Sequence, residues 1–425
     1  MQTEGMKKRI QSGELDDRFL DIYVDSSILA YQKERYINAI NKFESCYGAG
    51  EAEVFSAPGR SEVGGNHTDH QHGEILAASI NLDAIGVVRA MDDNQIRIIS
   101  DGYEELLVSL HDMEAKAEER ETTKALIKGV VAGFVNRGYS VGGFCAYVTS
   151  DVLIGAGLSS SAAFETLIGT ILSGLYNNMI ISAVEIAMIG QYAENVYFGK
   201  PCGLMDQMAC SVGNLVHIDF RNPNNPEVEK LDFNLSESGY SLCITDTKGS
   251  HADLTDEYAA VPQEMKAVAN YFGKEVLRDV AYAEVMKEIP ALRKKLGDRS
   301  VMRAVHFFCE NERVVKEVDA LKQGNMNLFL NTVKASGDSS FKYLQNVYSS
   351  NDIVNQNVSL ALMVSDILLE TQGVSRVHGG GFAGTIQSFV KTDFVATYKT
   401  QMDQIFGADA CKVLNIRKYG GMKVI

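Results

Sequence analysis

The sequence has 425 residues, with 45% hydrophobic and 22% charged side chains and a formal net charge of −15 at pH 7. This length gives room for two or three domains, and the composition is typical of a soluble globular protein. An acidic chain without a run of Lys or Arg is not expected to bind nucleic acid. No apolar run approaches the roughly 20 residues that a membrane span requires, so no membrane partner is expected either.

The cysteines and the first residues indicate a compartment. Seven cysteines are scattered along the chain and form no Cys-x-x-Cys pair, a pattern typical of reduced thiols in the cytoplasm. The chain begins with charged and polar residues rather than with an apolar signal segment, so no signal peptide is predicted. We therefore expect a cytoplasmic protein.

Residues 1–50 are predicted to be helical and indicate no chemistry. After a short predicted strand at 53–55, the stretch Ser56–Gly73 concentrates polar, charged and glycine residues, and we predict a loop that carries a site. Its side chains at His67, Asp69, His70 and His72 could suggest a metal centre, but no second ligand cluster lies nearby. A pocket that hydrogen-bonds a polar ligand is favoured over a metal centre.

The next elements are predicted from their residue patterns. Strands are expected at 84–91 and 95–100, joined by a turn. Apolar residues at helical spacing predict a helix over 122–137, and a strand over 143–149 leads to a loop rich in glycine and serine.

This loop, Gly155–Ser161, precedes a predicted amphipathic helix. Ser159 or Ser160 can cap the helix, so that unpaired N–H groups and the positive end of the helix dipole face the loop. That combination binds phosphate, although an ordinary turn before a core helix stays open on these residues alone. The loop has neither the Walker A pattern nor the spaced glycines of a Rossmann turn. The apolar face of the helix is formed by Phe164, Leu167, Ile168, Ile171, Leu172 and Leu175.

A second helix is predicted over 182–198, where Gly199 and Pro201 end it. A short helix then follows and places Asp206 near its N-terminus. By itself this carboxylate indicates only charge complementarity with the helix dipole.

Together these stretches resemble the galactokinase family, within the GHMP kinases that also include homoserine, mevalonate and phosphomevalonate kinases. The order and spacing of the motifs are kept from about residue 53 to the C-terminus. The matching motifs are Gly59-Arg60, His67-Thr-Asp69, the loop 155–163, Pro201–Gln207, Asp246–Tyr258, Arg303–Arg313 and Arg376–Gly384.

The resemblance implies an α+β fold with two lobes and the site between them. Residues 1–212 would form an N-terminal sugar- and ATP-binding lobe similar to a ribosomal protein. Residues 213–425 would form the C-terminal GHMP kinase lobe, which is ferredoxin-like. The glycines of 376–384 would press against the nucleotide side of the cleft.

The resemblance also implies the roles of individual residues. Asp206 would orient or deprotonate the reacting hydroxyl, and Arg60 would stabilise the developing charge. Mg²⁺ would be held by Ser161 and Glu194, an oxygen-only pair that suits a hard cation. The sugar pocket would comprise Asn66, His67, Thr68, Asp69, Gly203 and Tyr258. ATP would be bound by Gly155, Ala156, Gly157, Leu158, Ser159, Ser160 and Ser161.

The expected activity is ATP-dependent phosphorylation of the C1 hydroxyl of galactose by a monomer whose partners are ATP and a monosaccharide. Four positions depart from the family: Asn66 stands for Glu, His70 for Tyr, Glu62 for Asn and Leu153 for Pro. The family Glu at position 66 is expected to accept hydrogen bonds from the C6 hydroxyl, and a neutral Asn there no longer repels a uronate. Galacturonate is therefore an alternative substrate, and a non-catalytic sensor of galactose and ATP is the alternative from another class.

Overall fold

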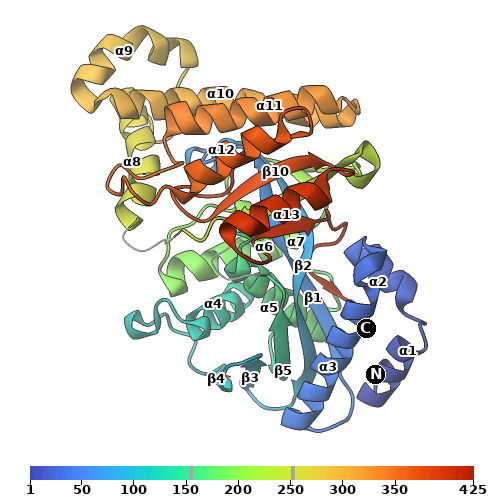
Figure 1. Ribbon diagram of the computed structural model, residues 1–425. Coiled ribbons are helices and arrows are strands. Elements are labelled where there is room, and N and C mark those ends of the chain that lie inside the picture. The colour runs from blue at the N-terminus through green and yellow to red at the C-terminus, as the bar shows by residue number, and fades with distance from the viewer. Residues whose placement is uncertain (153–156, 250–253) are drawn as a thin grey trace.

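The computed structural model describes residues 1–152, 157–249 and 254–425. It contains an eight-stranded and a four-stranded sheet, each flanked by helices (Figure 1). β3 and β5 pair in parallel, and the other pairs among the described strands are antiparallel. The large sheet has the order β12-β1-β2-β5-β3-β4. In addition, β6 pairs with β2, and β7 pairs with β6. Its strands are β1 (Glu53–Gly64), β2 (Glu74–Met91), β3 (Gln95–Ser100), β4 (Leu106–Ser109), β5 (Gly143–Ser150), β6 (Leu215–Asp219), β7 (Glu227–Leu231) and β12 (Met422–Lys423).

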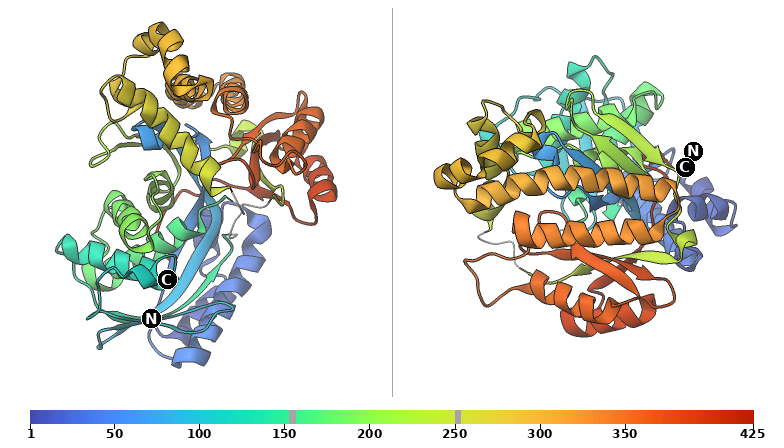
Figure 2. Two further views of the ribbon diagram at one scale, coloured as in Figure 1. Left: turned by 90° about the vertical axis from the view of Figure 1, so that its left-hand side faces the viewer. Right: turned by 90° about the horizontal axis from the view of Figure 1, so that it is seen from above.

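Alternating side chains let this sheet bury both of its faces. In β5, Phe144 and Ala146 pack on one side, whereas Cys145 and Tyr147 pack on the other. The first side is covered by α4 (Thr123–Asn136), α5 (Ser160–Asn177) and α6 (Ala183–Tyr192), and the second by α1 (Thr3–Gln11), α2 (Asp16–Tyr23) and α3 (Leu29–Tyr47). Figure 2, left, shows these two helical layers with the sheet between them.

A buried carboxylate connects the N-terminal helices with the large sheet and with the C-terminal segment. Asp83 of β2 has no exposed surface and accepts hydrogen bonds from Arg35 of α3 at 2.6 Å, Tyr23 of α2 at 2.8 Å and Arg417 at 2.8 Å. Arg417 belongs to the C-terminal segment that returns to the large sheet, where β12 pairs with β1. The N- and C-termini consequently lie close together (Figures 1 and 2).

The second sheet has the order β11-β8-β10-β9 and is also covered on both faces. Leu242 and Ile244 of β8 pack towards α10 and α11, and Cys243 between them packs towards α12 and α13. The elements are β8 (Tyr240–Asp246), α8 (Thr255–Tyr271), α9 (Tyr282–Leu296), α10 (Asp298–Lys322), α11 (Met326–Ser339), α12 (Asn357–Leu369), β9 (Gly373–Val377), β10 (Thr385–Lys391), α13 (Val395–Phe406) and β11 (Cys411–Leu414).

The structure differs from the sequence prediction mainly at the first dense motif. β1 runs through Pro58-Gly59 to Gly64, and β2 begins at Glu74, so only residues 65–73 form the predicted loop. Register shifts in β1 at 58–60 and 62–64 accommodate the proline and the turn of the chain. β6, β7 and β12 join the large sheet from beyond residue 212, and the lobe boundary near 212 stays a prediction. No helix among the described residues is long and apolar enough to span a membrane.

Candidate active site

The two residues predicted to be catalytic form an ion pair. Arg60 lies on β1 and Asp206 on the first turn of α7 (Met205–Val212), and Arg60 Nε donates to Asp206 Oδ1 over 2.8 Å. Burial raises the pKa of Asp206, but the charge and hydrogen bond of Arg60 outweigh it and lower the pKa below its usual value. Asp206 is therefore a carboxylate at neutral pH, suited to orient a hydroxyl group.

The end of the glycine and serine loop meets this pair. Ser159 occupies the N-cap position of α5 with a left-handed φ of 56°, yet its side chain does not cap the helix. Its hydroxyl donates to Asp206 Oδ2 instead, and Arg60 Nη1 donates to the carbonyl of Gly157. The N-terminus of α5 is therefore left without a side-chain cap beside the ion pair, which suits an anionic ligand. Leu158, Ser160 and Ser161 belong to the same turn, whereas Leu153, Gly155 and Ala156 lie outside the described residues.

Asp69 and Gly203 lie against one another at a small pocket. A Cβ on Gly203 would come within 1.7 Å of Asp69 Oδ2, so a larger residue there would displace the Asp69 carboxylate. The pocket has a volume of about 160 Å³, and both residues line it together with His70, His72, Gln191, Cys202, Leu204, Phe220 and Pro223. No group of three or more His, Cys, Asp or Glu side chains within the described ranges is arranged to hold a metal ion.

Two further predicted sugar residues contact the glycine turn after β9. His67 Nε2 lies 3.0 Å from the carbonyl oxygen of Gly380, and the Tyr258 hydroxyl donates to the carbonyl of Gly381 at 2.8 Å. Burial lowers the pKa of His67 to about 4, so it is neutral at physiological pH. The glycines of this turn therefore lie beside residues predicted to bind the sugar. His378 and Thr385, at the two ends of this turn, are the neighbours of Gly157. The predicted contact of the glycines with the nucleotide stays a prediction.

Asn66 and Thr68 are fully buried, and their side chains are hydrogen-bonded within the protein. The Thr68 hydroxyl lies 2.8 Å from the carbonyl of Gly65 and 2.7 Å from that of Glu74. The amide of Asn66 contacts Glu62 and several residues of the C-terminal half, as described below. The predicted sugar contacts of Asn66 and Thr68 stay predictions.

The predicted metal ligand Glu194 belongs to a buried cluster that the sequence did not indicate. Gln207 Nε2 donates to Glu194 Oε2 at 2.7 Å and to Glu165 Oε2 at 3.0 Å. Burial, and then the charge of Glu194, raise the pKa of Glu165 well above its usual value. Glu165 lies on α5, the apolar helix after the loop. A carboxylate at a position that the helical pattern predicts to be buried was the feature of the sequence that could have indicated it.

The donor set fits a hard cation. Glu165 Oε1 and Gln207 Oε1 are buried without a protein partner. Glu194, which shares the Gln207 amide with Glu165, and Ser161, one helical turn before Glu165 on α5, also offer oxygens. Such donors suit Mg²⁺ that keeps several waters. The orphaned oxygens indicate that the cluster is built for a cation or proton that the protein groups themselves do not supply.

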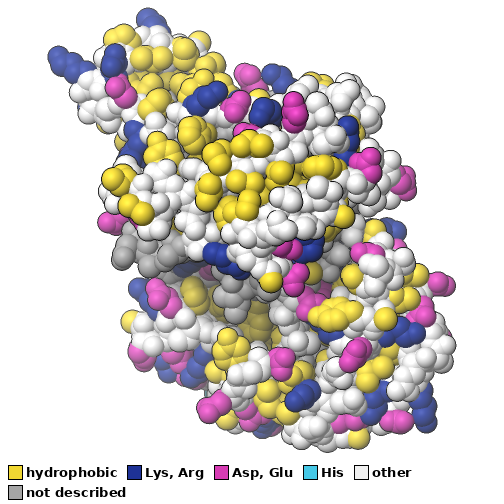
Figure 3. Space-filling view, in the orientation of Figure 1, with side chains coloured by type: hydrophobic (Ala, Val, Ile, Leu, Met, Phe, Trp, Pro, Cys, Tyr) yellow, Lys and Arg dark blue, Asp and Glu magenta, His cyan; other side chains and the backbone are white. Residues whose placement is uncertain are grey.

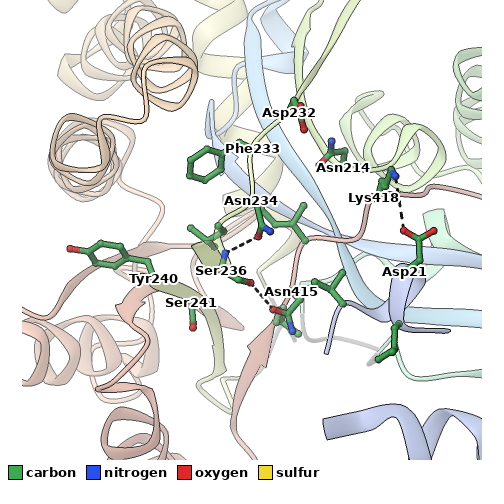
Figure 4. Close-up of a pocket in the computed structure, with 15 residues that line it drawn as sticks. Asp21, Asn214, Asp232, Phe233, Asn234, Ser236, Tyr240, Ser241, Asn415 and Lys418 are labelled. Carbon is green, nitrogen blue, oxygen red and sulfur yellow. Dashed lines mark hydrogen bonds and ion pairs between the residues drawn. The ribbon is translucent and has the colours of Figure 1, made fainter. Parts of the chain in front are cut away.

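A larger cavity of about 320 Å³ lies away from this site (Figure 4). It opens between α2, the segment joining β7 to β8, and the segment after β11, and Asp21 and Lys418 form an ion pair across its edge. None of the predicted site residues lines it.

Comparison with known proteins matches these features. The model of the GHMP kinases N terminal domain matches residues 125–214, and the galactokinase galactose-binding signature matches residues 41–90. A galactokinase of Streptomyces coelicolor is 29% identical over 376 residues, which cover 87% of this chain and 93% of the relative. A galactokinase of Glaesserella parasuis serovar 5 is 31% identical over 361 residues, covering 83% of this chain and 89% of the relative.

Solved structures support the fold. A galactokinase of Lactococcus lactis complexed with galactose superposes with a TM-score of 0.77 at 24% identity, covering 90% of this chain and 98% of that chain. A mevalonate kinase superposes with a TM-score of 0.59 at 14% identity, covering 86% and 98%. The chain thus has the predicted GHMP kinase fold and is a phosphotransferase that uses an alcohol group as acceptor. Within that class, it belongs to the galactokinase family.

Proposed function

We propose that the protein transfers the γ-phosphoryl group of ATP to the C1 hydroxyl of galactose and that it requires Mg²⁺. The observation that carries this proposal is the Arg60–Asp206 ion pair at the uncapped N-terminus of α5. It joins a carboxylate for the hydroxyl, a cation for the developing charge and a phosphate-binding turn. The family match, which includes the galactose-binding signature over 41–90, supports galactose as the acceptor.

In this mechanism Asp206 orients the C1 hydroxyl of the sugar. As the new bond from the sugar oxygen to phosphorus forms and the bond to the leaving ADP oxygen breaks, the hydroxyl proton passes late towards Asp206. A carboxylate whose pKa is lowered is a weak base, which favours positioning over early proton abstraction. Arg60 offsets charge on the transferring group, and the N–H groups of the α5 N-terminus bind phosphate oxygens. Bound Mg²⁺, held by Ser161 and Glu194, would neutralise phosphate charge.

The sugar would lie against Asp69 and Gly203, in and beside the pocket that these two residues line. A polar pocket can reject the C4 epimer glucose, because a hydroxyl pointing the wrong way leaves a buried partner unpaired. We therefore expect galactose to be phosphorylated and glucose to be rejected.

The test is to incubate the purified protein with ATP and Mg²⁺ and each of galactose, galacturonate, N-acetylgalactosamine, arabinose and glucose. Formation of ADP should be ranked by kcat/KM, and the product identified by phosphorus NMR. Galactose 1-phosphate is the expected product. Binding of ATP and galactose without any ADP would instead favour the sensor, and galacturonate leading by tenfold would reassign the substrate.

We also propose that the protein is a cytoplasmic monomer. The seven free cysteines support the compartment, because thiols stay reduced in the cytoplasm. Hydrophobic side chains gather over the part of the surface formed by α12, where Met363 and Ile367 are 52% and 70% exposed (Figure 3). Light scattering should give a mass near 46.6 kDa, and twice that value would mean that this surface is covered by a second copy.

A further inference from the structure

Two positions at which the chain departs from its family contact each other. Asn66 Nδ2 donates to Glu62 Oε1 over 3.0 Å. The resemblance to the galactokinase family implies Asn at position 62 and Glu at position 66, so relative to that expectation the amide and the carboxylate have exchanged places. A single exchange would put two amides or two carboxylates together, whereas the reciprocal exchange preserves a donor and an acceptor.

The side-chain amide of Asn66 is fully engaged. Its Nδ2 also donates to the carbonyl of Gly379 at 2.7 Å, and its Oδ1 accepts from Ser340 Oγ at 3.2 Å and Asn346 Nδ2 at 2.8 Å. An amide offers two donors and two acceptor lone pairs, and these four hydrogen bonds use all of them. Asn66 has no exposed surface, so it has neither a free group nor access for a sugar hydroxyl.

The carboxylate of Glu62 lies in the contact between the N-terminal and C-terminal halves of the chain. Glu62 is 3% exposed and accepts from Arg376 Nη2 at 2.7 Å, and Arg376 also donates to the carbonyl of Val63 at 2.6 Å. The partners of the pair therefore come from η7 (Ser340–Leu344), from Asn346 and from β9 with its glycine turn. Turning Asn66 towards a substrate would break four hydrogen bonds and leave buried polar groups unpaired.

We propose that the Glu62–Asn66 exchange determines specificity by removing the recognition of the sugar's C6 group from position 66. The pair binds the two halves of the chain together and leaves no side-chain acceptor at residue 66 for a C6 hydroxyl. The kinase then accepts galactose and galactose-configured sugars that lack this hydroxyl with similar efficiency. This inference rests on the proposed function and deepens it.

The experiment compares galactose with 6-deoxygalactose and with L-arabinose, which lacks C6 entirely. For the unchanged protein, kcat/KM for galactose and for 6-deoxygalactose should differ by less than about threefold, since a lost productive hydrogen bond would cost tenfold or more. In Glu62→Asn/Asn66→Glu the preference for galactose should rise at least tenfold, because a carboxylate again occupies position 66. The matched control is Asn234→Glu/Glu237→Asn, which exchanges an exposed Asn–Glu pair at 2.9 Å and should leave the ratio unchanged.

Unfolding measurements test the contact without relying on activity. Asn66→Glu alone puts two carboxylates together and should lower the midpoint of thermal unfolding, and adding Glu62→Asn should restore most of it. The inference is overturned if the unchanged protein prefers galactose over 6-deoxygalactose tenfold or more. It is also overturned if the double exchange folds and leaves the ratio unchanged. If no sugar of the series is phosphorylated, the proposed function fails, whereas recovery of stability in the double exchange would still verify the contact.

Discussion

Arg60 and Asp206 are 146 residues apart in the chain, yet the guanidinium Nε of one lies 2.8 Å from a carboxylate oxygen of the other. Arg60 is 6% exposed, so the pair is largely removed from water on the arginine side. A buried guanidinium needs a carboxylate, and that carboxylate is at the same time kept ionised. The ion pair thus fixes both the position and the charge of the groups that would face the reacting hydroxyl.

The first prediction concerns this pair. Asp206→Asn keeps the shape of the side chain but removes its charge, and Arg60→Ala removes the cation. Either change should lower kcat by about 10²- to 10⁴-fold, the usual contribution of a positioned acid–base group. Binding of ATP, measured by calorimetry without sugar, should stay near that of the unchanged protein, because transition-state interactions are lost without ground-state binding. A variant that keeps most of its turnover would remove that residue from the mechanism.

The second prediction concerns Ser159, whose hydroxyl bond to Asp206 helps to lower the pKa of that carboxylate. Without the hydroxyl, the pKa of Asp206 should rise, and the acid limb of kcat/KM should move to higher pH by roughly 0.5 to 1 unit. Ser159→Ala and Ser159→Gly form a matched pair, because alanine keeps the Cβ that serine has at the left-handed φ of 56°, whereas glycine also relieves the backbone strain there. Equal shifts in both variants identify the hydroxyl as the cause, and a shift in glycine alone would identify the backbone.

Much of the helical framework around the site could be predicted from the sequence. The apolar spacing after the glycine and serine loop predicted α5, and the helix predicted to begin at 182 is α6, where Ser182 and Glu185 form a capping box. Gly199, with a φ of 86°, ends the helical stretch as expected. These signals are local, since capping and helical periodicity involve residues within a few positions of one another.

The unpredicted features depend on contacts between distant residues. The proline and glycine in β1 indicate a loop locally, but pairing with β2 on both sides of them, at Pro58–Asp83 and Arg60–Ser79, keeps them in a strand. The left-handed turn of Ser159 and its bond to Asp206 follow from packing across 47 residues. The hydrogen bonds that occupy the whole side-chain amide of Asn66 come from partners up to 313 residues away. No periodicity in the sequence contains such information.

The third prediction concerns Mg²⁺. Glu194→Gln removes a carboxylate from the buried cluster and should raise the Mg²⁺ concentration for half-maximal rate by at least about tenfold. Even the loss of a residue that only hydrogen-bonds a metal ligand lowers metal affinity by that factor. Glu165→Gln is the matched control, since the same Gln207 amide contacts both carboxylates. The raised pKa of Glu165 favours its neutral form, and an amide still offers an oxygen to the cation, so Glu165→Gln should change the titration less than Glu194→Gln does. If the two variants respond alike, Glu194 acts only through the structure of the cluster.

The fourth prediction concerns pH and stability. Burial raises the pKa of Glu62 to about 7, although Arg376 and Arg60 oppose the shift. Because the folded protein holds this proton more tightly than the unfolded chain does, the stabilisation is complete below the unfolded pKa and is lost as pH rises through about 7. One pKa unit corresponds to about 1.4 kcal/mol, so the loss between pH 4.5 and 8 is on the order of 3 kcal/mol.

Urea unfolding of the parent and of Glu62→Gln across this pH range tests the effect. The variant should lose less stability than the parent as pH rises. Glu74→Gln gives the opposite sign as a comparison. Burial raises the pKa of Glu74, but His217 and Arg278 lower it below its usual value, so its contribution is present above the unfolded pKa and is lost as pH falls. Parallel pH profiles for the parent and Glu62→Gln would contradict the assignment.

The last prediction concerns the N-terminal helices. Arg35 of α3 donates to the fully buried Asp83 and lies 3.1 Å from Asp151, the residue that leads into the glycine and serine loop. Removing one partner of a buried ion pair leaves the other charge uncompensated, which costs about 3–5 kcal/mol. Arg417 remains beside Asp83 at 2.8 Å and compensates part of that charge, so Arg35→Met should lower the free energy of unfolding by roughly 3 kcal/mol, at the lower end of that range.

A double-mutant cycle separates the charge from the packing. Asp83→Asn in the Arg35→Met background should cost much less than Asp83→Asn alone, because the unpaired carboxylate is then gone. Tyr31→Phe is the matched control on the same helix, since it removes only the partly exposed hydrogen bond from Tyr31 to Asp151 at 2.9 Å and should cost about 1 kcal/mol or less. If the costs of Arg35→Met and Asp83→Asn simply add, the two side chains contribute independently, and their ion pair does not hold α3 to the sheet.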